Sequence, residues 1–184
     1  DEDISLSLAG IQQKIEADNN TYVALDAASL QPIYAKLRNN NLLAEPSTQD
    51  LDYFSATLNV DLGWADLVSA TSYSNTRSDG VTDASLIYGV LFPLFGAPAG
   101  KSAYYVDVQV RKTTQEVRLA SKPADVFEWL VGGFYDHENS QNKQLLTAQN
   151  LDGTSIEGLD PLVTASLPSI YREYAFFGDV TYKF

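Results

Sequence analysis

Apolar and polar side chains alternate along six stretches of the chain. In the clearest, residues 53–62, every second side chain is apolar and most of the intervening ones are polar. The same period of two recurs at residues 4–15, 67–73, 104–110, 127–135 and 173–184, and pairing of the 104–110 stretch could continue to Leu119. Successive side chains of a β-strand point to opposite faces of a sheet, so the pattern predicts an all-β fold with about six strands.

Two local features refine this pattern. The alternation changes phase at Gly10, and a glycine at a phase change is typical of a β-bulge, which we expect there. Helix is scarce: Asp26 precedes one candidate, residues 27–39, but Pro32 lies inside it and limits it to a short loop helix.

The connections between the predicted strands alternate between long and short. Residues 17–50, 76–103 and 138–170 form long connections, whereas Gly63-Trp64 and residues 122–125 form short ones. This order places all the short turns at one end of an antiparallel sheet. Outer-membrane β-barrels have this asymmetry, and strands of about 9–12 residues suit a tilted membrane strand.

Composition excludes several functions. The chain has 24 acidic and 12 basic residues, a formal net charge of −12 and no cysteine. Nucleic acid is therefore not expected as a partner, because phosphate binding needs a basic surface. Disulfides and cysteine-based metal sites are excluded. Catalysis is not expected either, since no candidate nucleophile has a histidine partner and no glycine-rich phosphate loop is present.

Acidic residues suggest two further sites. Asp136, His137 and Glu138 are consecutive, so on a strand only the two carboxylates can converge, and a polar strand end is the simpler interpretation. Asp152, Glu157 and Asp160 lie among glycines in a predicted loop and are candidate Ca²⁺ ligands, although the spacing is not that of an EF-hand. Asp79, Asp83, Asp125 and Asp160 show no pairing that suggests acid–base chemistry.

Two predicted hairpins resemble the barrel of TonB-dependent outer-membrane receptors. The first is Leu58-Asn59-Val60-Asp61-Leu62-Gly63 followed by residues 67–73. The second, more specific one joins Thr114-Gln115-Glu116-Val117-Arg118-Leu119-Ala120-Ser121 to Trp129-Leu130-Val131-Gly132-Gly133-Phe134-Tyr135, and residues 174–182 resemble the strand that follows. The resemblance is strongest over residues 51–184.

The resemblance implies a non-enzymatic nutrient receptor in the outer membrane, of the siderophore or glycan type. Residues 1–184 would be a single segment of its barrel, because six strands cannot close a membrane barrel. The plug domain of the family would not be part of this segment. The implied partners are the lipid bilayer, the plug and the transported substrate.

The alternation also predicts which side chains meet lipid. The expected lipid-facing residues are Phe54, Leu58, Val60, Leu62, Phe176, Val180 and Tyr182. The expected lumen-facing residues are Tyr53, Thr57, Asn59, Glu173, Asp179 and Lys183. Trp64, Tyr182 and Phe184 suit the aromatic girdles of a membrane interface.

Three other interpretations remain open. The chain could be a small complete barrel ending at Phe184, or a soluble β-sandwich that acts as a binding module. It could also form an extracellular cross-β filament by stacking copies of itself, with residues 86–92, 127–135 and 174–184 in dry interfaces. Stacked acidic residues would then face solvent or hold Ca²⁺. A curved antiparallel sheet with the loops at one end would favour the barrel over the filament.

Overall fold

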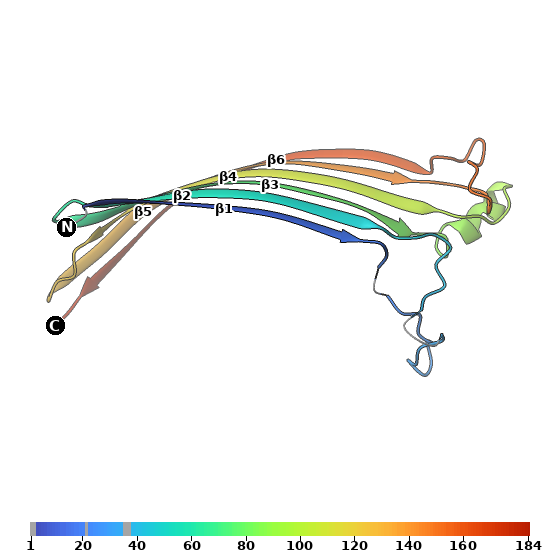
Figure 1. Cartoon of the computed structure of the whole chain (residues 1–184), viewed down its shortest axis with the longest axis horizontal. Helices are drawn as coiled ribbons and strands as arrows, with labels where there is room; N and C mark the ends of the chain where they lie inside the picture. Colours follow the sequence, from blue (N-terminus) through green and yellow to red (C-terminus); the bar gives the residue numbers. More distant parts are fainter. Residues whose placement is uncertain (1–2, 21, 35–37) are drawn as a thin grey trace.

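The computed structural model describes residues 3–20, 22–34 and 38–184, which form one six-stranded antiparallel sheet in the order β1-β2-β3-β4-β5-β6 (Figure 1). The all-β prediction is confirmed. The strands are β1 (Ile4–Ala17), β2 (Ser47–Asp61), β3 (Ala65–Asp83), β4 (Ala103–Ser121), β5 (Phe127–Leu146) and β6 (Val163–Tyr182). Every strand pairs with its neighbour in sequence, so the sheet is a continuous meander.

The strands are longer than the sequence predicts, at 14 to 20 residues each. In most strands the apolar alternation stops well before the strand ends, whereas the loop-side half of β4 carries Val106, Val108 and Val110 on one face. The predicted bulge at Gly10 is also wrong, because the β1–β2 register runs without a break through the Gly10–Phe54 pair. A Cβ at Gly10 would stand 3.4 Å from the Phe54 ring, so this glycine instead leaves room for an aromatic neighbour.

The register divides the side chains of the sheet between two faces. One face contains Leu58 and its row of direct partners, among them Leu6 and Val117, and the other contains Asn59. The β1–β2 connection hangs on the concave side of the arch (Figure 1), and its residues Asn20 and Glu45 line a pocket of about 270 Å³ together with strand residues of the Asn59 face. The Asn59 face is therefore the concave face, and the Leu58 face is convex.

Two short turns lie at one end of the sheet, as predicted. Residues 62–64 join β2 to β3, where Gly63 has a φ of 81° and donates its backbone N–H to Asp61 Oδ1 at 2.7 Å. Residues 122–126 join β4 to β5, and Ala124 donates its N–H to Glu128 Oε1 at 3.2 Å. The positive φ explains why glycine occupies the first turn.

The long connections gather at the opposite end around a small apolar core. Phe92 is 1% exposed and packs with Ala148 and Ile156, which belong to the β5–β6 connection. Phe92 lies in η1 (Gly89–Phe95), a short 3₁₀-helix that the sequence analysis did not predict. In the region of the predicted loop helix, residues 27–34 contain only a turn, whose N–H groups at Ala28 and Ser29 bond to Asp26 Oδ1, and residues 35–37 lie outside the described part.

Two close backbone contacts fix these connections to each other. The Gly100 N–H donates to the Gly89 carbonyl at 3.1 Å, and Lys101 and Gln149 exchange backbone hydrogen bonds at 2.8 and 2.9 Å. A Cβ at Gly89 would stand 2.1 Å from the Gly100 carbonyl oxygen, so no larger residue fits here without movement. The β3–β4 and β5–β6 connections are consequently one packed unit at this end of the sheet.

Candidate functional site

An apolar band covers the part of the convex face nearest the short turns. Its members are the convex-face residues Ile4, Leu6, Leu8, Phe54, Ala56, Leu58, Val60, Leu67, Tyr73, Val117, Leu119, Phe127, Trp129, Val131, Tyr135, Tyr174, Phe176, Val180 and Tyr182. Most of the large members are exposed, and Phe176 is 91% exposed. Soluble single-chain proteins rarely leave a contiguous apolar surface of this extent open to water.

Aromatic residues mark both margins of the apolar band. Near the short turns, the ring centroids of Trp64 and Trp129 lie 6.3 Å apart. Those of Tyr182 and Phe184 lie 5.3 Å apart. At the margin toward the loops, Tyr135 and Tyr174 stack with their centroids 5.0 Å apart. From Tyr174 to Tyr182 the strand rises about 27 Å. A tilt of about 40° reduces this to about 20 Å of height, close to the apolar belt of about 25 Å in outer-membrane barrels.

Three polar side chains interrupt the apolar band, and they satisfy one another. Gln115 donates its amide to Ser69 Oγ at 3.0 Å and accepts a hydrogen bond from the Thr71 hydroxyl. The register places all three on the convex face of β3 and β4. Polar groups that face hydrocarbon are costly unless they are hydrogen-bonded, so this pairing suits an apolar environment.

Glycines accommodate two rings on β6. A Cβ at Gly132 would stand 2.4 Å from Cζ of Phe177, which therefore lies directly over Gly132 on the concave face. A Cβ at Gly133 would make an ordinary contact of 3.5 Å with Phe176 on the convex face. Of the two glycines, Gly132 is therefore the one whose partner leaves no room for a side chain.

The concave face is mostly polar, although it includes apolar side chains such as Val106, Val108 and Phe177, and it carries a charged cluster. Lys112 Nζ lies 2.6 Å from Asp136 Oδ2 and 3.9 Å from Glu138 Oε2. Tyr171 donates its hydroxyl to Glu173 Oε2 at 3.0 Å. Asp136 is 3% exposed, and its Oδ1 has no hydrogen-bond partner among the described residues. Two carboxylates therefore lie within 4 Å of one ammonium group, and one oxygen of the buried carboxylate is unpaired among the described residues.

The predicted faces agree with the register. Phe54, Leu58, Val60, Phe176, Val180 and Tyr182 lie on the convex face, whereas Tyr53, Thr57, Asn59, Glu173 and Asp179 lie on the concave face. Leu62 and Lys183 lie just outside the strands. Asp136 and Glu138 share the concave face and His137 lies on the other, as expected for consecutive strand residues. The interpretation of these residues as a polar strand end is wrong, because they lie in the middle of β5.

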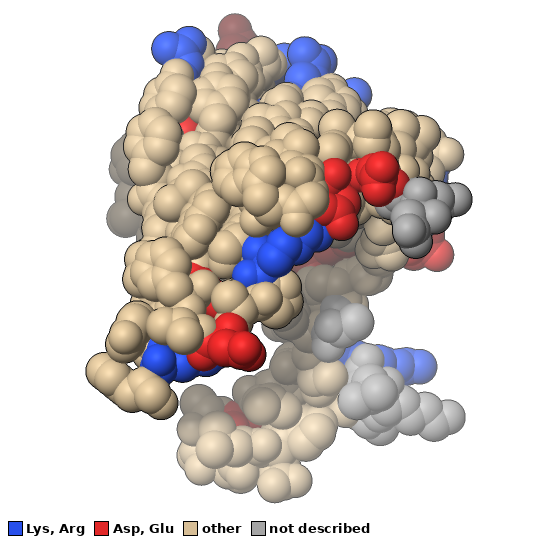
Figure 2. All heavy atoms as spheres, turned by 90° about the vertical axis from the view of Figure 1, so that its left-hand side faces the viewer, with Lys and Arg blue, Asp and Glu red and all other residues tan. Residues whose placement is uncertain are grey.

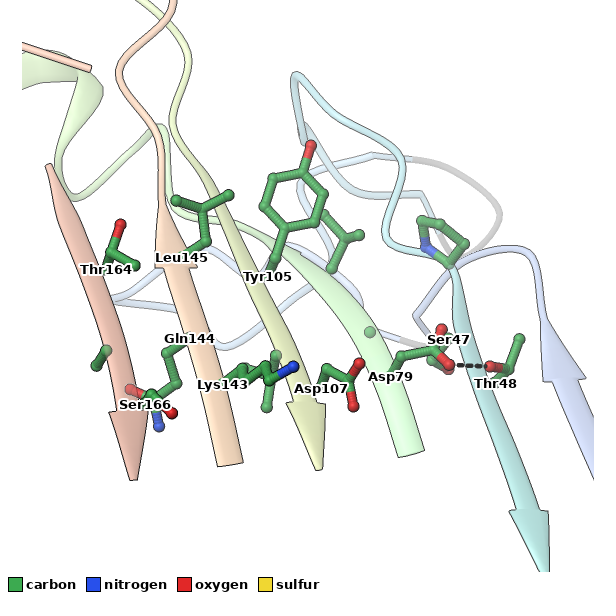
Figure 3. A pocket seen from close by; sticks show the side chains of 15 residues that line it. Ser47, Thr48, Asp79, Tyr105, Asp107, Lys143, Gln144, Leu145, Thr164 and Ser166 are labelled. Atoms are coloured by element: carbon green, nitrogen blue, oxygen red, sulfur yellow. Dashed lines mark hydrogen bonds between the residues drawn. The ribbon is translucent and has the colours of Figure 1, made fainter. Parts of the chain in front are cut away.

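Beyond the apolar band, toward the loops, the convex face becomes polar. A groove of about 470 Å³ crosses the sheet between two rows of side chains (Figure 3). One wall contains Asp79, Asp107 and Lys143, and the other contains Tyr105 and Leu145. Asp79 accepts a hydrogen bond from the Thr48 hydroxyl, and Asp107 pairs with Arg77 at 3.1 Å. The carboxylates therefore have ordinary structural partners.

Ion pairs lie at the end of the molecule that carries the short turns. Figure 2 shows this end, with acidic and basic side chains next to one another along the rim and uncharged atoms over much of the arch above it. Lys122 Nζ lies 2.8 Å from Asp61 and 2.5 Å from Asp66. Lys183 Nζ lies 2.6 Å from Glu128.

The structure gives the three candidate Ca²⁺ ligands separate positions. Asp152 Oδ1 accepts hydrogen bonds from the N–H and hydroxyl of Thr154, at 2.9 and 2.7 Å, and these bonds hold the pKa of Asp152 below its ordinary value. Asp160 Oδ1 accepts the N–H of Ala148 at 2.8 Å, and Glu157 is exposed. Among the described residues, no three acidic, histidine or cysteine side chains form a group suited to a metal ion. The geometry thus gives the Ca²⁺ prediction no support.

Other acidic residues have structural contacts rather than acid–base partners. Asp83 Oδ2 accepts the N–H groups of Leu42 and Leu43, and its Oδ1 accepts the N–H of Ser85 at 2.9 Å. These bonds tie the β1–β2 connection to the end of β3. The sequence analysis missed this contact because Asp83 and Leu42 are 41 positions apart and share no motif.

In the described part of the chain, no helix has the length and apolar character needed to cross a membrane. No family model matches the chain, and no curated protein or solved structure matches it either.

Proposed function

We propose that this chain is part of the wall of an outer-membrane β-barrel, in a nutrient receptor of the TonB-dependent type. The observation that carries the proposal is the two-faced sheet. Its convex face has an apolar band between aromatic margins, whereas its concave face at the same level carries polar and charged side chains such as Asn59, Glu116 and Arg118. Lipid-facing and lumen-facing side chains alternate in this way in membrane barrels.

The free edges of the sheet support the same proposal. β1 and β6 each have one neighbour in the described sheet, so each leaves a row of backbone groups unpaired. Unpaired backbone groups cannot remain in a bilayer, and further strands on both sides would satisfy them. The barrel that we propose is therefore larger than six strands.

The receptor part of the proposal comes from the resemblance of the two hairpins and from the architecture of the outer end. The β3–β4 and β5–β6 connections pack together around Phe92, and exposed apolar side chains of η1 surround this core. Long, ordered loops at one end of a barrel are suited to capture of a ligand at the cell surface. The transported substrate would be a siderophore or a glycan, as the resemblance implies.

A fractionation experiment tests the barrel. The protein that contains this chain is expressed with a signal for export, and its membranes are separated by density. We expect it in the outer-membrane fraction, soluble only with detergent, with a mobility on cold SDS gels that changes after boiling. A protein that stays soluble in detergent-free buffer and melts as a monomer would contradict the proposal and favour the β-sandwich.

The other two self-contained architectures receive less support. A sandwich needs a second sheet packed about 10 Å from the apolar face, and the described residues form one sheet. A filament would stack copies of the chain, whereas the segments proposed for its dry interfaces lie here in antiparallel strands or near η1. The filament stays a prediction, and electron microscopy of the purified chain would test it.

A further inference from the structure

Three basic side chains lie on the convex face directly beyond the apolar band. They are Arg111 on β4, His137 on β5 and Arg172 on β6. His137 and Arg172 are direct partners in the β5–β6 register, and Arg111 pairs with Asn139, one step diagonally from His137. Direct and diagonal neighbours on one face of a sheet have Cα–Cα separations of about 5 and 7–8 Å, so the three side chains can reach a common ligand.

These charges have no anionic partner within the described part of the chain. Neither Arg111 nor Arg172 takes part in an ion pair, and Nδ1 of His137 has no hydrogen-bond partner. Both arginines are exposed. The formal net charge of the chain is −12, so a local group of unpaired arginines is unusual for its surface.

The nearby carboxylates are occupied or lie on the other face. Asp107, on the same face of β4, is paired with Arg77 at 3.1 Å. Asp52 accepts a hydrogen bond from Gln12 at 3.1 Å. The carboxylates of Asp136 and Glu138 belong to the concave face, where they surround Lys112 rather than the arginines.

The position of the three side chains relative to the apolar band identifies the ligand. On the next convex-face row toward the band, Tyr135 and Tyr174 stack at 5.0 Å and form its margin. In a membrane barrel, such an aromatic margin lies at the level of the lipid headgroups. Arginine is well suited to phosphate, because its planar guanidinium can donate two parallel hydrogen bonds to one phosphate group.

We infer that Arg111 and Arg172 bind the phosphate of a membrane lipid whose acyl chains lie along the apolar band. This inference rests on the proposed function, since it needs the convex face to meet lipid. The ligand class is a phosphorylated lipid of the leaflet on the loop side. His137 lies on β5, the strand between those of the two arginines, and its Nδ1 has no hydrogen-bond partner among the described residues.

Native mass spectrometry of the purified barrel protein in detergent tests the inference. The probes are dioleoyl phosphatidylglycerol, dioleoylglycerol, which lacks the phosphate, and inorganic phosphate. The test variant is the Arg111→Gln/Arg172→Gln double substitution. The matched control is Arg118→Gln, which removes a charge from the concave face of the same strand.

We expect the double variant to bind phosphatidylglycerol at least tenfold more weakly than the native protein, with the control unchanged. Dioleoylglycerol should bind weakly to all of them, and inorganic phosphate at the same concentration should not displace the phospholipid. Equal binding by native and double-variant protein would overturn the inference. So would equal losses in the control, equal binding of dioleoylglycerol, or displacement by inorganic phosphate, which would indicate a site for a soluble anion.

The outcome also separates this inference from the proposed function. The protein could fractionate with the outer membrane and shift on heating, yet bind phosphatidylglycerol equally with and without the two arginines. That result would support the barrel and contradict the lipid site. A protein that is soluble without detergent would contradict both the barrel and the lipid site.

Discussion

Placing a charge at Leu58 tests the face assignment most directly. Leu58 lies on the convex face, four residues from Phe54 at one margin of the apolar band and four from Leu62 at the short turn. Each separation is about 14 Å along the strand. Leu58 is therefore close to the middle of the band, where an arginine in a membrane barrel costs about 2–4 kcal/mol.

The neighbouring residue provides a matched control. Asn59 lies on the same strand but on the concave face, where its side-chain amide donates to Ser5 Oγ at 3.3 Å. Asn59→Arg keeps the same charge and nearly the same depth, and loses only one exposed hydrogen bond, so it should cost less than about 1 kcal/mol.

Equilibrium unfolding of the whole barrel protein in lipid vesicles measures both costs. We expect Leu58→Arg to lower the free energy of unfolding by about 2–4 kcal/mol, and Asn59→Arg to leave it nearly unchanged. Equal tolerance at both positions would refute the assignment of the convex face to lipid. A larger loss of stability for Asn59→Arg would mean that the concave face, rather than the convex face, meets lipid.

Four other substitutions probe packing and hydrogen bonding. Gly132→Ala should lower the melting temperature through a loss of about 1–3 kcal/mol, because its Cβ meets the Phe177 ring at 2.4 Å, whereas Gly133→Ala should change little. Phe92→Ala should remove about 3–5 kcal/mol of local stability, and hydrogen exchange should show lost protection in the outer connections but not in the strands near the short turns. Gln115→Leu should cost about 1–2 kcal/mol in unfolding experiments, since it leaves two hydroxyl groups of the apolar band without partners; full stability after this change would contradict the proposed hydrogen-bond pairing.

The sequence predicts the sheet well where one face is apolar. In β2 and β6 the alternation alone assigns Leu58 and Asn59, and likewise Phe176 and Phe177, to opposite faces of the sheet. A shift of one residue would move every apolar side chain of the strand to the polar face, so only one assignment keeps them together. The tight turns are equally readable, since Gly63 has the positive φ that a short turn requires.

The sequence fails where both faces are polar. The half of β3 nearest the loops, residues 74–83, is rich in Ser, Thr, Asn and Asp, and these residue types favour turns in isolation. Its strand conformation is imposed by pairing with β2 and β4 on either side, which no local pattern reports. The Phe92 core was missed for a related reason, because its partners come from a connection about 55 residues away.

The extra length of the strands has a consequence for where the ligand sites lie. The apolar band occupies only the part of the sheet near the short turns, while β5 continues from Tyr135 to Leu146 with polar side chains at most positions. Eleven further residues extend the strand by about 37 Å, which is about 28 Å of height at the tilt of about 40° used for the apolar band. A sheet held by its backbone ladder can project this far from a bilayer without a core of its own. It would thus hold the loop unit around Phe92, and the groove lined by Asp107 and Lys143, well outside the membrane. Surface capture of substrate and lipid contact would then occur on different levels of one continuous sheet.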